Sequence, residues 1–273
     1  MHKSYYFSKE ESIRLIQDSN QMNRAFLYGD ALFDTIVYKN SKLIFAEAHY
    51  FRLLAGMRQL RMEIPDFFTQ DYWEDQLIGI IVANNLQEAR VRTSVYRDTT
   101  GLYTPKHNNV AFIISVDTLN YSIKEEYRLG VYKDYLLSTN QIDTIKTTNR
   151  IHNVLASIYA KENNLDNCVL LNHKKQITET IHANIFLVSG HSVKTPSLDA
   201  GCINGIVRQK LINYLHKSED FELIETSIEP YELLQADEIF ITNSVIGIQH
   251  ISSYKRKEFP HSVSDFLRNK ICK

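Results

Sequence analysis

The chain has 273 residues, 44% hydrophobic and 23% charged, which is the composition of a globular protein with a buried core. Lys and Arg number 31 against 32 Asp and Glu, and no basic run is long enough to follow a phosphate backbone, so nucleic acid is not an expected partner. Three scattered cysteines and no metal-ligand spacing argue against a disulfide framework and against a metal site. No apolar run of about 18 residues is present, so we expect a cytoplasmic protein without a membrane span.

The first half of the chain predicts strands and helices in alternation. Strands are expected at 31–45 and 89–116, where "ARVRTSVYR" alternates apolar and polar residues. The segment "EAHYFRLLAGMRQLRMEI" predicts a helix with one buried face, and a less periodic helix is expected around 70–86. The buried face of the first helix consists of Tyr50, Leu53, Leu54, Met57 and Leu60. The first twenty residues read as helical or irregular.

A polar stretch, "DTLNYSIKEEYR", follows the apolar run that ends near Val116 and indicates a change of domain. We therefore expect an N-terminal α+β domain at 1–117, a linker at 118–122 and a C-terminal domain at 123–273. In the second half the patterns predict five strands and two helices. The strands are at 130–137, 167–172, 176–180, 184–188 and 237–243, and the helices at 150–163 and 205–217.

The helix expected at 150–163 carries apolar residues at i, i+3, i+4, i+7 and i+8. This spacing predicts that the face is buried and that it pins the preceding loop, which holds Lys146. Either Thr147 or Thr148 is expected to cap the helix. The apolar face consists of Ile151, Val154, Leu155, Ile158 and Tyr159.

Three short segments carry candidate chemistry. The amine of Lys146, if desolvated beside the helix, becomes a nucleophile for an aldehyde, although a lone lysine is more often a solvated surface group. Gly205 precedes a helix whose first amides, at Ile206 and Val207, can hold a phosphate. One side of that helix carries an apolar stripe: Val207, Leu211, Ile212 and Leu215. A turn at 243–244 offers two further amides and a serine hydroxyl at the end of a buried strand.

Six blocks in a fixed order resemble the class IV (fold type IV) pyridoxal-phosphate enzymes, which include branched-chain and D-amino-acid aminotransferases and aminodeoxychorismate lyase. They are "NRAFLYGDALFDT", "EAHYFRL", "KTTNR", "TETIHANIF", "TPSLDAGCINGIVR" and "ADEIFITNS", between residues 23 and 244. The resemblance implies a two-domain α+β fold like that of D-amino-acid aminotransferase. Its smaller N-terminal α/β domain and larger C-terminal domain would hold pyridoxal 5′-phosphate (PLP) between them. It also implies a homodimer in which a loop of the neighbouring subunit completes the site.

The same resemblance assigns roles to individual residues. Lys146 would form a Schiff base with PLP, and Glu179 would pair with the pyridine nitrogen. A carboxylate there keeps the nitrogen protonated, which makes the ring an electron sink. The phosphate would be bound by a set of residues from three blocks: Arg52, Ile206, Val207, Asn243 and Ser244. Asn23 stands where the family usually has Asp, which we interpret as a changed structural pairing.

Details of the blocks distinguish the possible reactions. The Asn-Arg pair that follows Lys146 is typical of aminodeoxychorismate lyases, and Thr35 stands where branched-chain aminotransferases carry glycine. Phe33 stands where D-amino-acid aminotransferases place a tyrosine that donates a hydrogen bond, and a phenyl ring cannot donate one. Against the lyase, Asp98 follows Arg97 where lyases commonly have an Arg-Gly pair.

We therefore expect a PLP-dependent lyase of folate precursor synthesis that converts 4-amino-4-deoxychorismate into 4-aminobenzoate and pyruvate, with Lys146 removing the proton. Thr35 would bond the substrate, and Tyr28 and Arg97 are further candidates for substrate contact. The alternative is a class IV aminotransferase that acts on branched-chain or other amino acids with 2-oxoglutarate. A non-catalytic protein on the same scaffold is a third reading, which the intact Lys146, Glu179 and Arg52 disfavour.

Overall fold

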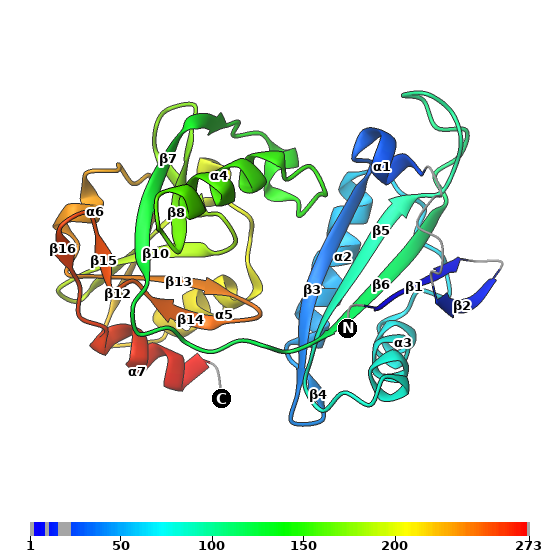
Figure 1. Cartoon of the computed structure of the whole chain (residues 1–273), viewed down its shortest axis with the longest axis horizontal. Helices are drawn as coiled ribbons and strands as arrows, with labels where there is room; N and C mark the ends of the chain where they lie inside the picture. Colours follow the sequence, from blue (N-terminus) through cyan, green and yellow to red (C-terminus); the bar gives the residue numbers. More distant parts are fainter. Residues whose placement is uncertain (1–2, 9–10, 16–22, 272–273) are drawn as a thin grey trace. The chain divides into compact units, whose positions relative to one another are not determined.

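The computed structural model describes residues 3–8, 11–15 and 23–271 of the chain (Figure 1). The described chain forms two compact units. Unit 1 contains the described residues up to Asn120 together with Lys146–Asn149, and unit 2 contains Tyr121–Ile145 and the described residues from Arg150 onward. The chain therefore leaves unit 1 within the segment expected to be a linker, 118–122. The expected C-terminal domain at 123–273 included Lys146–Asn149, whereas the structure groups this segment with unit 1.

Unit 1 is a six-stranded antiparallel sheet with the strand order β2-β1-β6-β5-β3-β4. Helices α2 and α3 pack on one face of it through the apolar side chains of alternate strand positions. The strands are β1 (Lys3–Ser8), β2 (Glu11–Leu15), β3 (Ala31–Lys39), β4 (Lys42–Leu43), β5 (Ala89–Arg97) and β6 (Val110–Thr118); the helices are α1 (Arg24–Tyr28), α2 (Ala46–Gln59) and α3 (Gln70–Ala83).

Two expectations for unit 1 have different outcomes. The apolar stripe of α2 is confirmed, because Tyr50, Leu53, Leu54 and Met57 are all buried in the core of this unit. The helical or irregular reading of the N-terminal stretch is wrong for β1 and β2, because β1 pairs with β6 along five residues. That pairing partner lies more than 100 residues away in the chain, so local pattern did not reveal it. Positions 1–2, 9–10 and 16–22 of the stretch lie outside the described residues.

Unit 2 contains two five-stranded sheets, β12-β11-β10-β13-β14 and β16-β15-β7-β8-β9. The strands are β7 (Arg128–Leu137), β8 (Asn167–Asn172), β9 (Ile177–Thr180), β10 (Asn184–Ser189), β11 (Ser192–Pro196), β12 (Glu222–Thr226), β13 (Glu238–Asn243), β14 (Gly247–His250), β15 (Ser253–Tyr254) and β16 (Lys257–Glu258). The helices are α4 (Ile151–Glu162), α5 (Ile206–Leu215), α6 (Glu232–Gln235) and α7 (Ser262–Ile271), with short 3₁₀ turns at Gln141–Thr144 and Leu198–Ala200.

The core of unit 2 has two layers, one on each side of β10 and β13. Residues 185, 187, 239 and 241 pack with residues of β8 and β9 from the second sheet. Residues 186, 188 and 240 point to the opposite face and pack against α5 and α7. The apolar stripe expected on α5 is confirmed here, because Val207, Leu211, Ile212 and Leu215 are buried.

The buried face expected for α4 is wrong for four of its five residues; the fifth, Tyr159, is partly buried and packs with residues of β7 and β8. This helix buries Ala156 and Ala160, which pack with residues of β7 and β8. Small side chains let a helix axis approach a sheet closely, so the larger residues are left on the outside. Ile151, Val154, Leu155 and Ile158 are between 42% and 64% exposed. The expected threonine cap is also wrong, since Arg150 is the N-cap and its side chain makes no capping bond.

None of the helices in the described part of the chain combines the length and hydropathy that crossing a bilayer requires.

Candidate active site

Lys146 lies beside the start of β3 in unit 1. Its carbonyl oxygen accepts a hydrogen bond from the backbone N–H of Phe33 at 2.9 Å, and the N–H of Thr148 donates to the carbonyl of Ala31 at 3.0 Å. The lysine segment thus continues the pattern of strand pairing next to β3. Backbone pairing holds the loop in place, which is a different cause from the buried helix face that the sequence predicted.

Lys146 shares one sheet face with Phe33, Thr35 and Arg92. Leu32 and Ile36 of β3 point to the helices, so residues 33 and 35 point to the opposite face. The Lys146 Nζ lies 4.5 Å from the centre of the Phe33 ring, and the Arg92 guanidinium lies 3.7 Å from the same centre. Thr35 is directly opposite Arg92 in the pairing of β3 with β5. The structure therefore brings the predicted residues Lys146 and Thr35 to one face.

Arg92 is a candidate substrate ligand that sequence reasoning missed. Its place on the polar side of the alternating strand was visible, but its position opposite Thr35 depends on the strand register. Burial, together with the nearby Arg90, lowers the pKa of Arg92, which means that the local environment disfavours its charge. A bound carboxylate would offset that cost, so Arg92 suits an anionic substrate.

Arg52 is held by a buried carboxylate in unit 1. Its Nε and Nη2 donate to the two oxygens of Asp34 at 2.8 and 2.7 Å, and His49 Nδ1 lies 2.6 Å from Asp34 Oδ1. His49 and Arg52 are three residues apart on α2 and so present their side chains to the same partner. Although burial alone would raise the pKa of Asp34, Arg52 and His49 hold it well below its usual range. Asp34 and His49 were not predicted, although each stands inside one of the recognised blocks.

Replacing Asp34 by asparagine should lower the free energy of unfolding by about 3 kcal/mol, because it breaks a buried charge pair. The pKa of Asp34 is lower in the folded than in the unfolded state. Its contribution to the free energy of unfolding is therefore fully present above its unfolded pKa of about 3.9 and is lost as the pH falls toward the folded pKa. The deficit of the variant relative to wild type should therefore be constant above about pH 5 and shrink below about pH 4. Urea unfolding at several pH values measures this. The exposed Asp66→Asn is the control, and a deficit that does not change with pH would contradict the charge-pair explanation.

Arg97, predicted as a substrate contact, lies in a buried network of unit 1. Its Nε donates to Asp30 Oδ2 at 3.0 Å, and its Nη2 donates to the carbonyl of Leu60 at 2.6 Å. Its Nη1 contacts the carbonyl of Arg61 and the side-chain oxygen of Asn108. All three nitrogens are thus engaged with the protein. This environment favours a structural role for Arg97.

Tyr28, the other predicted substrate contact, is the last residue of α1. The Arg24 guanidinium lies 4.8 Å from its ring centre, and the ring of Tyr103 lies 5.7 Å away. Arg24 itself is buried and donates to Asp30 Oδ2 at 2.7 Å. Asn23, which stands where the family usually has Asp, accepts from the N–H of residue 26 and caps α1. The first block therefore orders the segment around Tyr28.

Glu179 lies in unit 2, near the end of β9, and is buried. Its Oε2 accepts the backbone N–H of Ile203 at 2.9 Å, while Asn184 donates to the carbonyl of the same residue at 2.8 Å. A Cβ atom at Gly205 would collide with the Asn184 side chain, so a larger residue here would displace the amide that holds Ile203. These contacts bring the carboxylate to the loop that leads into α5.

The start of α5 is suited to an anion. Gly205 is the N-cap and offers no side-chain bond, so the first-turn amides at Ile206 and Val207 form the positive end of the helix. The two side chains point into the core, which leaves only the backbone groups for a ligand. These features fit a phosphate group.

The predicted turn after β13 is built by the side chain of Asn243. Its Oδ1 accepts from the N–H groups of Val245 and Ile246, both at 2.9 Å, and its Nδ2 donates to the carbonyl of His182 at 3.1 Å. Ser244 lies inside this turn. Asn243 thus shapes the loop that contains Ser244.

Comparisons with known proteins identify similar chains. The family model described as amino-transferase class IV matches residues 31–254. An aminodeoxychorismate lyase from Vibrio harveyi is 27% identical over 259 residues, and the match covers 92% of each chain. A second relative, from Methanocaldococcus jannaschii, is provisionally described as a branched-chain-amino-acid aminotransferase. It is 28% identical over 230 residues, and the match covers 83% of this chain and 79% of the relative. A crystal structure from Legionella pneumophila, provisionally described as a 4-amino-4-deoxychorismate lyase, has a TM-score of 0.85 at 27% identity and covers 94% of this chain and 96% of its own.

Proposed function

Because the chain belongs to the class IV aminotransferase family of PLP-dependent enzymes, we propose that it converts 4-amino-4-deoxychorismate into 4-aminobenzoate and pyruvate. Two relatives described with this activity match over more than nine-tenths of the chain. Thr35 is the residue on which the choice of reaction rests. It lies on the same face of the unit 1 sheet as the Lys146 amine. According to the family resemblance, branched-chain aminotransferases carry at this position a glycine, which has no hydroxyl.

By their chemistry, the residues of each unit suit one part of the cofactor. The Lys146 amine would hold its aldehyde carbon, and Glu179 would hold its ring nitrogen. Arg52 and the first amides of α5 would hold the phosphate, and both are of the right kind: a guanidinium oriented by Asp34 and a helix start with no side-chain cap. When bound, PLP supplies an electron sink for negative charge at the reacting carbon of the substrate.

The protein side chains then move one proton and orient the substrate. The Lys146 amine takes the proton from the ring carbon that bears the amino group. The bond between the ring and the enolpyruvyl oxygen breaks, the ring becomes aromatic, and the released enolpyruvyl group takes up one proton and leaves as pyruvate. No net oxidation occurs. The Thr35 hydroxyl bonds the substrate near the moving proton, and Arg92, on the same sheet face, binds a substrate carboxylate.

Thr35→Val should lower the release of 4-aminobenzoate by roughly 10²-fold, the contribution of one positioned group in proton transfer. Valine keeps the branched shape that β3 requires and removes only the hydroxyl. Cofactor absorbance should not change. The measurement compares wild type, Thr35→Val and the exposed strand variant Thr118→Val for 4-aminobenzoate release. Equal rates in all three proteins would show that the Thr35 hydroxyl takes no part in the reaction.

The second candidate function is amino-acid transamination with 2-oxoglutarate, which the branched-chain and D-alanine aminotransferases among the relatives favour. The same protein preparation assayed with leucine, isoleucine or D-alanine decides between the two. A wild-type enzyme that forms keto acids and releases no 4-aminobenzoate would replace the lyase proposal with this one.

We also propose that the protein is a homodimer, with the exposed face of α4 in the subunit interface. The four apolar residues at 151, 154, 155 and 158 form a continuous stripe on this helix, because they follow its periodicity. A stripe of large aliphatic side chains left in water is typical of a surface that another protein covers. The expectation of a homodimer from the family resemblance agrees with this exposure.

Val154→Glu should weaken the dimer, because association would then bury a charge in an apolar contact. A central interface position is worth about 2 kcal/mol or more, so the dissociation constant should rise roughly 30-fold or more. Sedimentation velocity across a concentration series measures this shift from dimer to monomer. Lys161→Glu, an exposed position on the same helix, is the control. A dimer of unchanged affinity in Val154→Glu would place the interface elsewhere.

A further inference from the structure

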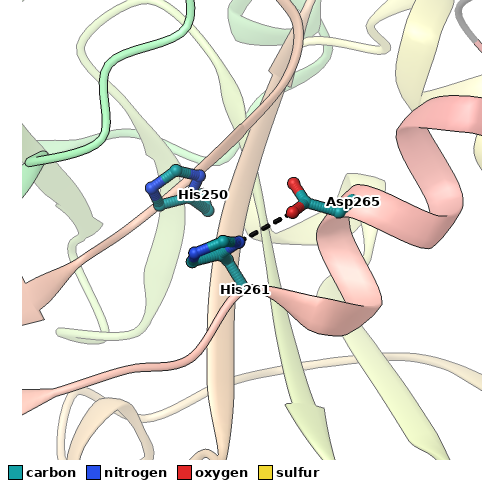
Figure 2. Close-up of side chains that lie close together, drawn as sticks. All are labelled: His250, His261 and Asp265. Carbon is teal, nitrogen blue, oxygen red and sulfur yellow. Dashed lines mark hydrogen bonds and ion pairs between the residues drawn. The ribbon is translucent and has the colours of Figure 1, made fainter.

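Three titratable side chains of unit 2 lie together near the start of α7. His250 is the last residue of β14, His261 immediately precedes α7, and Asp265 is in the first turn of that helix (Figure 2). Each offers one atom of a metal-ligand type, and these atoms lie within 4.8 Å of one another. In the described part of the chain this is the one such group. No role in the PLP chemistry involves these residues.

His250 is almost fully buried, at 2% exposure, and one contact determines which of its ring nitrogens donates a hydrogen bond. Its Nε2 lies 2.9 Å from the carbonyl oxygen of Glu125. A carbonyl only accepts hydrogen bonds, so Nε2 is a donor, and in the tautomer with one ring hydrogen Nδ1 presents a lone pair. Nδ1 is buried without a hydrogen-bond partner. Metal-binding histidines commonly show this arrangement, in which one nitrogen donates to a carbonyl and the other faces the ion.

His261 and Asp265 supply the other two groups from the surface. Their side chains are 47% and 39% exposed, and His261 Nδ1 lies 2.7 Å from Asp265 Oδ2. Arg268 Nη1 donates a hydrogen bond to the other carboxylate oxygen of Asp265, Oδ1, at 2.7 Å. The rings of His250 and His261 stack, with centres 4.5 Å apart and planes at 24°. Because a metal lies in the plane of each ring that binds it, the exposed His261 ring must turn while the buried His250 ring stays in place.

The backbone around the cluster is already ordered. Glu238 of β13 is buried, and its carboxylate accepts the N–H groups of Val263 and Ser264 at 3.0 and 2.6 Å. The Ser264 hydroxyl donates to the carbonyl of His261 at 3.0 Å. The start of α7 is thus fixed to the sheet that also carries His250. With the backbone held in this way, the proposed site calls for rotation of the His261 side chain.

We propose that His250, His261 and Asp265 form a binding site for a divalent transition-metal ion of the zinc type, completed by solvent. Two imidazoles and one carboxylate are ligands that Zn²⁺ accepts, and an open position for water is compatible with its coordination. The ion joins the end of β14 to the start of α7. Because the ion binds the folded state alone, it stabilises the protein by RT ln(1 + c/Kd), where c is the free Zn²⁺ concentration, so the melting temperature rises with the logarithm of c once c exceeds Kd.

Calorimetric titration of Zn²⁺ into tag-free holoenzyme, previously treated with chelator and dialysed, tests the site. Wild type should bind one ion per chain, and His261→Ala and Asp265→Asn should each weaken binding by at least about tenfold. Both replaced residues are partly exposed, so the variants should fold. His107→Ala, an exposed histidine of unit 1, is the control and should bind as wild type does.

Co²⁺ gives a second readout, because its visible absorption depends on the ligands that surround it. The bands should appear in wild type and be lost in His261→Ala, and added Zn²⁺ should raise the melting temperature of wild type more than that of the variant. Wild-type protein that binds no Zn²⁺, or a His261→Ala variant that binds Zn²⁺ as tightly as wild type, would overturn the site.

Discussion

Lys146→Ala should reduce turnover by about 10³-fold or more, since removal of a positioned proton-transfer group costs about 10²–10⁴-fold and the proposed function has this amine hold the cofactor as well. The change should leave unit 1 folded. The segment is held by backbone bonds from Phe33 and Thr148, which alanine retains. The loss would therefore report on the amine and not on the loop.

Borohydride reduction followed by peptide mapping is the direct measurement. It fixes the cofactor to whichever lysine forms a C=N bond with its aldehyde, and that residue should be Lys146. Lys161→Ala, an exposed position on α4, should keep full activity and the same labelled peptide. Label on another lysine, or full turnover in Lys146→Ala, would end the assignment.

Glu179→Gln should retain bound cofactor and lose most of its turnover, by roughly 10²-fold or more. The carbonyl oxygen of glutamine can still accept the N–H of Ile203, so the contact at 2.9 Å survives. A neutral amide does not stabilise a protonated pyridine nitrogen, so the electron sink is weakened while the phosphate contacts remain.

The measurement has two parts. Cofactor absorbance after dialysis reports binding, and the rate is taken in whichever assay, 4-aminobenzoate release or transamination, detects wild-type activity. Glu222→Gln, on the exposed part of β12, is the matched control. A Glu179→Gln enzyme with wild-type rates would place this carboxylate away from the ring.

Local pattern was sufficient for the family and for much of the secondary structure. Membership of the class IV family and its α+β fold are confirmed, because six short blocks in one order are specific even though each alone is weak. The helix periodicity of α2 and α5 also predicted the faces that are buried. In both helices the apolar stripe is the side that meets the sheet, so pattern and packing agree.

The same rule failed for α4, because periodicity reports which side chains are apolar and not which surface covers them. The close contact with β7 and β8 is made by Ala156 and Ala160, and the larger stripe is left exposed. A covering partner would not be encoded in the helix pattern. Burial on α4 was therefore decided by the size of the residues that fit against the sheet.

Side-chain partners were set by strand register and by contacts distant in sequence. Arg97 reads as a candidate ligand in the sequence, yet its nitrogens are taken up by Asp30 and by backbone carbonyls. Arg92 becomes a candidate only because β3 and β5 pair with Thr35 opposite it. A residue type and its block establish what chemistry is available, whereas the neighbours that orient or occupy each group depend on which strands meet.

The cluster of His250, His261 and Asp265 is the clearest case in which the sequence gives the residue types and only the tertiary structure brings them together. Its spacing matches no metal-ligand motif, so the sequence predicted no metal site. The three groups meet because Glu238 fixes the start of α7 against β13 and β14, which brings His261 and Asp265 to His250. Composition and order of blocks establish the family and its cofactor chemistry. Proximity between side chains arises only when the backbone hydrogen bonds of sheets and helix ends are formed, because those bonds set the distances on which binding depends.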